Sequence, residues 1–159
     1  MLLTKHFTFE EFVKSSRVIP AEFAIQKFEK LKETATLLEG VRKIVGDLPL
    51  YISTDGGLRT YETNKLNGGA KTSQHLEGEA ADFSCAKDAM EVFNLIRASF
   101  LTWGQLIAYP DRKFCHISTG TKRECLIATK NQYGEPVYKR VPLEDITAYE
   151  NPPKSKEIG

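Results

Sequence analysis

The apolar positions in the first third of the chain recur with the period of an α-helix. Between Pro20 and Gly46, apolar residues stand three, four or seven positions apart, with lysine and glutamate on the other side. This spacing gives a helix one apolar face, so we expect a long helix that begins after Pro20 and ends near Gly46. Thr8 and Glu11 have the spacing of a capping box and indicate a shorter helix before it. The apolar face of the long helix consists of Ala24, Phe28, Leu31, Ala35, Leu38 and Val45.

Short apolar or alternating runs in the rest of the chain predict β-strands, with one amphipathic helix at residues 88–100 between them. Residues 110–112 and 131–134 are short turns, so each is expected to join its flanking strands into a hairpin. The stretch 55–70 is rich in glycine, asparagine and threonine, and so long a loop within a domain is usually functional. The expected strands are residues 50–54, 80–83, 105–109, 113–119, 123–130 and 137–141.

Length and charge exclude several classes of protein. A chain of 159 residues is long enough for one domain with a substantial core, which we place at residues 1–149 and follow with a flexible tail at 150–159. The formal net charge of +1 argues against a nucleic-acid-binding protein. No apolar run is long enough for membrane insertion.

The cysteines and the first residues bear on the compartment. Cys85, Cys115 and Cys125 form no CxxC pair and no even-numbered disulfide framework. The start of the chain, MLLTKHFTFEEF, does not resemble a secretory signal peptide. We therefore expect free, mostly buried thiols in a protein that is synthesised in a reducing cytosol. We also expect the protein to be a monomer.

The candidate chemistry lies in residues 73–83, SQHLEGEAADF. His75 precedes Asp82 by seven positions, and Gly78 between them permits a sharp turn after which a strand can carry Asp82 back toward His75. A carboxylate that faces inward among alanine and phenylalanine needs a counter-charge, because an unpaired buried anion is very costly. A divalent metal shared with His75 would supply that charge, and a histidine without a ligand role is the alternative.

A catalytic zinc site typically has a third protein ligand. The sequence has three histidines, of which His6, in the N-terminal segment, is the weaker candidate. His116 lies in a predicted strand, where Cys115 points to the opposite face and is a poor co-ligand. The predicted site is therefore one zinc ion bound by His75, Asp82 and His116. Because both imidazoles must be neutral to bind a metal, we expect the affinity to fall below a pH of about 6.5.

Five positions, Ser73, His75, Gly78, Ala80 and Asp82, match the pattern S-x-H-x-x-G-x-A-x-D, and His-Ile-Ser follows downstream. On these residues the chain resembles the zinc D-Ala-D-Ala carboxypeptidase family, which includes phage peptidoglycan endopeptidases. The resemblance implies a small α+β domain with a central antiparallel sheet flanked by helices, related to the Hedgehog signalling domain. It also implies a zinc peptidase of phage or prophage type that acts on peptidoglycan stem peptides, either as a carboxypeptidase or as an endolysin-type endopeptidase. Such a protein would reach the cell wall after lysis or as part of a virion.

The resemblance assigns further residues to the site. Arg59 would bind the carboxylate or carbonyl of the substrate and steady a developing oxyanion, although Leu58 stands where the family has an aromatic residue. Ser73 would donate a hydrogen bond next to the metal, or merely cap the turn before His75. Gln105, in the family-like run GQLIAY, is predicted to bind substrate.

The general base is where the sequence departs from the family. Relatives have an acidic residue three positions before the second histidine, or a Glu at the end of the strand that begins Gln-Leu-Ile. Here these positions are Lys113 and Tyr109. We assign the base to Asp111 in the adjacent turn, with Glu77 and Glu79 as alternatives. The alternative interpretation of Asp111 is a purely structural one, in which its side chain caps its own backbone in the turn. The missing base leaves a second function open, a catalytically weak or inactive relative that serves as a cell-wall-binding or virion structural module.

Overall fold

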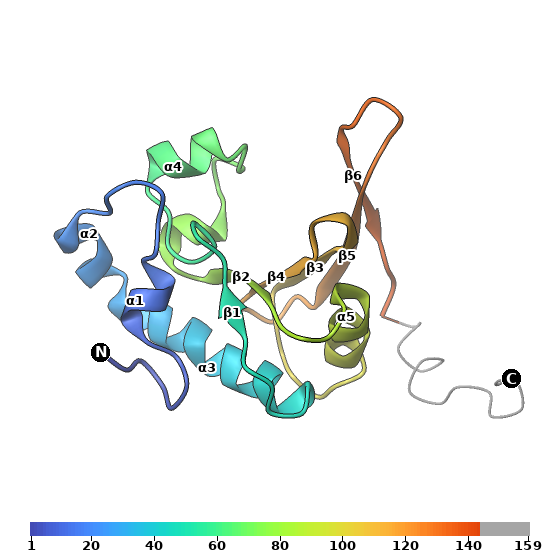
Figure 1. Ribbon diagram of the computed structural model, residues 1–159, viewed down its shortest axis with the longest axis horizontal. Coiled ribbons are helices and arrows are strands. Elements are labelled where there is room, and N and C mark those ends of the chain that lie inside the picture. The colour runs from blue at the N-terminus through green and yellow to red at the C-terminus, as the bar shows by residue number, and fades with distance from the viewer. Residues whose placement is uncertain (144–159) are drawn as a thin grey trace, which may run out of the picture.

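A six-stranded sheet forms the centre of the molecule (Figure 1). The computed structural model describes residues 1–143. The strands are β1 (Tyr51–Ile52), β2 (Ala80–Ser84), β3 (Gln105–Tyr109), β4 (Phe114–Ser118), β5 (Glu124–Lys130) and β6 (Pro136–Arg140). They lie in the order β1-β2-β4-β3-β5-β6, and all neighbours are antiparallel except β3 and β5. The α+β class is confirmed, and the sheet is mixed where a wholly antiparallel one was expected.

The parallel pair arises in the connection between β4 and β5. Residues 119–123 cross the start of β3, so that β5 begins beside β3 and runs in the same direction. The amide of Glu124 donates to the carbonyl of Gly104 at 2.9 Å and fixes this alignment. Both predicted hairpins, β3–β4 and β5–β6, are confirmed.

The described residues also form five α-helices and two 3₁₀-helices. They are α1 (Phe9–Phe12), α2 (Ala21–Gln26), α3 (Phe28–Ile44), α4 (Tyr61–Leu66), α5 (Ala89–Arg97), η1 (Gln74–Glu77) and η2 (Pro110–Arg112). The capping box of Thr8 and Glu11 before α1 is confirmed. The long helix expected at residues 20–46 is divided into α2 and α3, because Lys27 departs from helical geometry (φ −96°, ψ 4°). Gly46, with a φ of 91°, follows the end of α3 as predicted.

Helix α4 lies within the stretch 55–70, where the sequence predicted a loop. The hydroxyl of Thr60 accepts a hydrogen bond from the amide of Thr63 at 3.2 Å and caps the first turn. A helix of six residues is too short to show a recurring apolar face, so the pattern did not indicate it.

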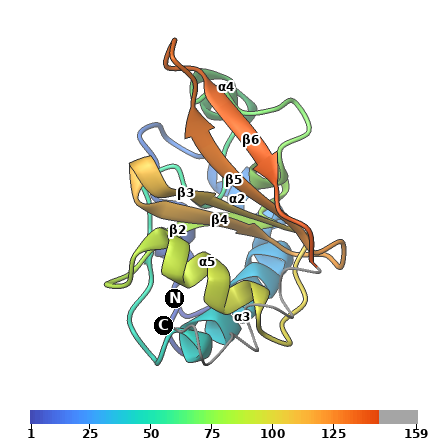
Figure 2. The ribbon, with the colours of Figure 1, turned by 90° about the vertical axis from the view of Figure 1, so that its right-hand side faces the viewer.

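Helices α3 and α5 cover one face of the sheet (Figure 2). The expected apolar face of the long helix belongs to the hydrophobic core, with Phe28 partly buried and its other members buried. Cys115 points to the same side, where its thiol contacts the carbonyl of Ala89 in α5 at 3.3 Å. Among the described residues the cysteines are free, with Cys115 and Cys125 buried and Cys85 half-buried.

The opposite face of the sheet is the floor of a cavity of about 1160 Å³. Helix α4 stands on one side of this face, and the β5–β6 hairpin stands on the other (Figure 1). Because side chains alternate along a strand, the residues of β3, β4 and β5 that face the cavity lie two positions apart in each strand. These residues are Gln105, Ile107, Tyr109, Phe114, His116, Glu124 and Leu126.

No helix in the described range 1–143 combines the length and the apolar character needed to cross a membrane. The expected end of the domain at residue 149 and the tail at 150–159 lie outside the described residues.

Candidate metal centre

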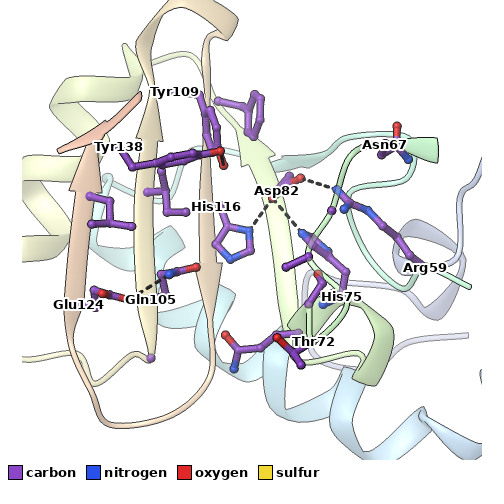
Figure 3. A pocket seen from close by; sticks show the side chains of 18 of the residues that line it. Arg59, Asn67, Thr72, His75, Asp82, Gln105, Tyr109, His116, Glu124 and Tyr138 are labelled. Carbon is purple, nitrogen blue, oxygen red and sulfur yellow. Dashed lines mark hydrogen bonds and ion pairs between the residues drawn. The ribbon is translucent and has the colours of Figure 1, made fainter. Parts of the chain in front are cut away.

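The three predicted metal ligands meet at the floor of the cavity (Figure 3). His75 comes from η1, Asp82 from β2 and His116 from β4. Asp82 and His116 are direct partners across the β2–β4 pair, so strand register alone places their side chains together. Oδ1 of Asp82 lies 2.9 Å from Nδ1 of His116 and 3.3 Å from Nε2 of His75. The structure thus brings together the set of ligands that the sequence predicted.

A tight turn carries the chain from His75 back into β2. The hydroxyl of Ser73 accepts a hydrogen bond from the amide of His75 at 3.2 Å and opens η1. Gly78 ends η1 with a left-handed conformation (φ 75°), which favours glycine. The hydroxyl of Thr34 in α3 donates to the carbonyl of Gly78 at 2.7 Å and anchors the turn to the core.

The orientation of the His75 ring is fixed by the chain behind it. Nδ1 of His75 lies 2.8 Å from the carbonyl oxygen of Gly57 and must donate to it, because a carbonyl oxygen only accepts. In a neutral imidazole the lone pair is then on Nε2, the nitrogen that faces Asp82. Gly57 itself has no room for a side chain, because an added Cβ would lie 2.2 Å from the carbonyl oxygen of Phe12. The amide of Arg59 donates to the carbonyl of His75 at 3.0 Å and completes the support.

The protonation states at the cluster suit a metal ligand set. Burial acts to raise the pKa of Asp82, but the adjacent His75 and His116 outweigh it and hold this pKa well below its usual range. Burial lowers the pKa of His116, against the opposing pull of Asp82. At neutral pH the carboxylate is therefore ionised and the His116 imidazole is neutral, as metal binding requires.

The spacing of the donor atoms fits zinc. A tetrahedral zinc ion with bonds of about 2.0–2.1 Å holds its ligand atoms about 3.4 Å apart. The two distances from Asp82, 2.9 and 3.3 Å, are close to that value, and all three donor atoms lie within 4.8 Å of one another. Two imidazoles and one carboxylate also form a donor set typical of catalytic zinc, which leaves one position for water or substrate.

Arg59, predicted to bind substrate, lies beside the cluster and points to Asp82 (Figure 3). Its guanidinium donates to the carbonyl of Asp55 at 2.7 Å, to Oδ1 of Asn64 at 3.2 Å and to Oδ2 of Asp82 at 3.2 Å. Asn64 in turn donates to the carbonyl of Ala70 at 2.7 Å and ties the loop after α4 to the site. Arg59 therefore orients a predicted metal ligand, and its contact with substrate stays a prediction.

Ser73 and Gln105, the other predicted substrate-binding residues, both line the cavity. The Ser73 hydroxyl accepts from the His75 amide, which is the capping role that the sequence left open for it. The side chain of Gln105 lies on the sheet floor and donates to Glu124 at 3.0 Å. Their contacts with substrate stay predictions.

The predicted base, Asp111, is exposed in η2 and lines a second, smaller hollow next to the cavity. The cavity that holds the ligand cluster does not include it among its lining residues. The alternatives Glu77 and Glu79 pair instead with Lys27 at 2.7 Å and Lys30 at 3.2 Å on the α2–α3 side. The identity of the base stays a prediction.

Two groups of cavity residues were missed in the sequence. Glu124, at the start of β5, has a side chain only 11% exposed and faces the cavity floor. Tyr109 and Tyr138 bring their hydroxyl oxygens within 3.4 Å of each other (Figure 3), and Tyr109 stacks on Phe114 with the ring centroids 4.5 Å apart. Burial and the contact with Tyr138 raise the pKa of Tyr109, so its phenol keeps its proton. A parallel β3–β5 pair would have predicted Glu124 as the neighbour of Gln105, but the sequence pattern gives no sign of that pairing.

A buried cluster of two imidazoles and one carboxylate, open to a cavity on one side, is the kind of site found in metal-dependent hydrolases. A family model described as Peptidase M15 matches residues 5–118, so the chain belongs to the peptidase M15 family. Peptidases of this family depend on zinc, in agreement with the donor set. No curated protein matches the sequence. The match includes all three ligands, whereas β5 and β6, which form one wall of the cavity, lie beyond it.

Proposed function

We propose that the protein is a zinc peptidase that hydrolyses peptide bonds in peptidoglycan stem peptides. The proposal rests on the cluster of His75, Asp82 and His116 at the floor of an open cavity, in a chain of the peptidase M15 family. When bound there, zinc would polarise the scissile carbonyl and activate a water molecule. The three side chains would hold the ion and leave its remaining position open to the cavity.

The size of the cavity and its extent on both sides of the ligand cluster favour cleavage within a stem peptide over removal of the last residue. Its volume of about 1160 Å³ exceeds the roughly 300–1,000 Å³ of sites for small molecules. Arg59 and Asn67 lie on one side of the ligand cluster, and Glu124 and Tyr138 lie on the other (Figure 3). An extended peptide can therefore contact the protein on both sides of the scissile bond.

Hydrogen-bond donors of the chain would stabilise the charge that develops on the carbonyl oxygen. Arg59 is a permanent cation whose side chain is largely but not fully buried next to Asp82. Tyr109 offers a phenol that stays protonated. Donors that are already in place in a partly buried site need no rearrangement when the charge appears, which is why such groups accelerate hydrolysis.

One observation favours a second candidate, a wall-binding module with weak or no activity. The cavity lining includes three carboxylates, and each has protein partners. Asp55 accepts from two serine hydroxyls at 2.6 Å, Asp82 contacts the imidazoles and Arg59, and Glu124 pairs with Arg140 at 2.7 Å. A general base must instead come within reach of the attacking water.

Digestion of purified peptidoglycan decides between the two candidates. We expect zinc-loaded wild-type protein to release new peptide ends, and we expect neither chelator-treated protein nor His116→Ala to do so. The masses of the products separate removal of one D-alanine from cleavage within the stem. Sedimentation of the zinc-loaded protein with cell walls, without any new peptide ends, would refute the peptidase and support the binding module.

The proposal includes the setting in which the protein acts. Its partner is the peptidoglycan stem peptide, and we propose that a monomer meets the cell wall after lysis or as part of a virion. The proposal takes this setting from the resemblance of the site motif to phage endopeptidases.

A further inference from the structure

A chain of polar contacts crosses the cavity floor from the edge of the sheet toward the metal ligands. Arg140 on β6 donates to Oε2 of Glu124 at 2.7 Å, and Nε2 of Gln105 on β3 donates to Oε1 of Glu124 at 3.0 Å. Gln105 and Glu124 are direct neighbours in the parallel β3–β5 pair. Gln105 lies between Glu124 and His116 (Figure 3).

The contact with Glu124 determines which way the Gln105 amide points. A side-chain amide has an NH₂ group that only donates and an oxygen that only accepts, and an ionised carboxylate only accepts. The NH₂ group must therefore face Glu124, so the amide oxygen faces the other way, toward the His116 side of the cavity (Figure 3). A neutral partner at position 124 would allow both orientations.

Both ends of this arrangement are held in place. The side chain of Glu124 is only 11% exposed, and Arg140 occupies its second oxygen. The backbone amide of Gln105 donates to the hydroxyl of Ser118 at 2.9 Å, which fixes β3 against β4 at this point. The Gln105 oxygen is thus a preorganised hydrogen-bond acceptor on the floor of the cavity.

We propose that Glu124 is a positioning residue that holds the Gln105 amide oxygen toward the cavity, where it accepts a hydrogen bond from one backbone N–H of the peptide substrate. This inference rests on the proposed function and names a subsite of it. A peptide offers its N–H and carbonyl groups alternately along its length. An acceptor fixed at one point of the floor therefore selects the register in which the peptide lies over the metal ligands.

The test uses a synthetic stem pentapeptide and a matched series in which each amide in turn is replaced by an ester. An ester removes one N–H donor and nearly preserves the shape of the peptide. Peptide affinity is measured by calorimetry on metal-free protein, and KM and kcat are measured on zinc-loaded protein. We expect one ester peptide to bind wild-type protein about three- to tenfold more weakly than the parent, as for the loss of one hydrogen bond.

The variants separate orientation from charge. Glu124→Gln should bind the parent peptide about three- to tenfold more weakly, raise KM with little change in kcat, and lose most of the penalty for the ester. The double variant Gln105→Glu/Glu124→Gln exchanges donor and acceptor, presents an oxygen to the cavity again and should regain the ester penalty. Glu135→Gln is the control, because Glu135 accepts from the amide of Asn131 at the same distance of 3.0 Å but lies in an exposed loop outside the cavity.

Two results would overturn the inference while leaving the peptidase intact. One is wild-type affinity for the parent peptide in Glu124→Gln, and the other is an undiminished ester penalty in that variant. Failure of the proposed function looks different, since zinc-loaded wild-type protein would then hydrolyse no peptide of the series. If it also bound none of these peptides, the peptidase and the acceptor role would fail together.

Discussion

Zinc should stabilise the folded protein by an amount that follows from the assembly of its ligands. His116 and Asp82 are 34 positions apart in the chain and meet only through the pairing of β2 with β4, so the unfolded chain cannot present the same site. A ligand that binds only the folded state at a hundred times its Kd adds about 2.7 kcal/mol to the free energy of unfolding. For a domain of this size, about 2–4 °C of Tm per kcal/mol gives an expected rise of roughly 5–10 °C.

The assay is thermal unfolding of chelator-treated protein during titration with zinc, with histidine variants as probes. His116→Ala removes a ligand and should abolish the rise in Tm. His6→Ala is the matched control, because His6 lies in the N-terminal segment, contacts Glu39 of α3 at 2.7 Å and is not part of the ligand cluster. That variant should show the full rise.

The difference between the zinc-induced rise in Tm of His116→Ala and that of His6→Ala decides whether zinc binds at the predicted site. An equal rise in Tm for wild-type protein and His116→Ala would show that zinc binds elsewhere and would refute the assignment of the site. A rise that His6→Ala loses and His116→Ala keeps would place the metal at the N-terminal segment. Elemental analysis of each sample shows whether a missing rise reflects absent zinc.

The remaining predictions concern pH, packing and the base. Burial lowers the pKa of His116, so protons compete with zinc at this ligand only below the ordinary histidine value of about 6.5. The zinc affinity, measured by competition with a chelator, should therefore be constant above that pH and fall below it. A fall that begins above pH 7 would contradict this prediction. Gly57→Ala should lower the free energy of unfolding by more than about 2 kcal/mol and weaken zinc binding. The new Cβ would lie 2.2 Å from the carbonyl oxygen of Phe12 and would displace the Gly57 carbonyl that holds His75. A wild-type free energy of unfolding in urea would contradict this prediction. If Asp111 is the base, Asp111→Asn should reduce turnover about a hundredfold or more at unchanged zinc content, and wild-type turnover would exclude Asp111.

The cluster of candidate metal ligands could be predicted because its arrangement follows from local rules. The turn at Gly78 and the alternation of β2 require only short stretches of sequence, and they place His75 and Asp82 on one side. His116 required one long-range step, the pairing of its strand with β2. With only three histidines in the chain, few assignments were possible for that step.

The other wall of the cavity could not be predicted, because it depends on a pairing that leaves no local pattern. The side chains of β5 alternate in the same way whether the strand pairs parallel or antiparallel, and with β3 or with another neighbour. The approach of Glu124 to Gln105, and of Tyr138 to Tyr109, follows from the parallel β3–β5 pair and the β6 strand beyond it. Helix α4 was missed for another reason, since six residues capped by one threonine carry too little periodicity.

The two roles of Arg59, as support for Asp82 and as the predicted substrate contact, are compatible. A guanidinium has five N–H groups, and Asp55, Asn64 and Asp82 take up one each, on three different nitrogens. Two N–H groups remain, one on each terminal nitrogen, and two is the number that a carboxylate can accept from a guanidinium. Because the other three contacts fix the orientation of the guanidinium, a substrate would meet donors whose direction is already set. The network that orients the metal ligand would then also set the direction from which a substrate oxygen approaches the metal.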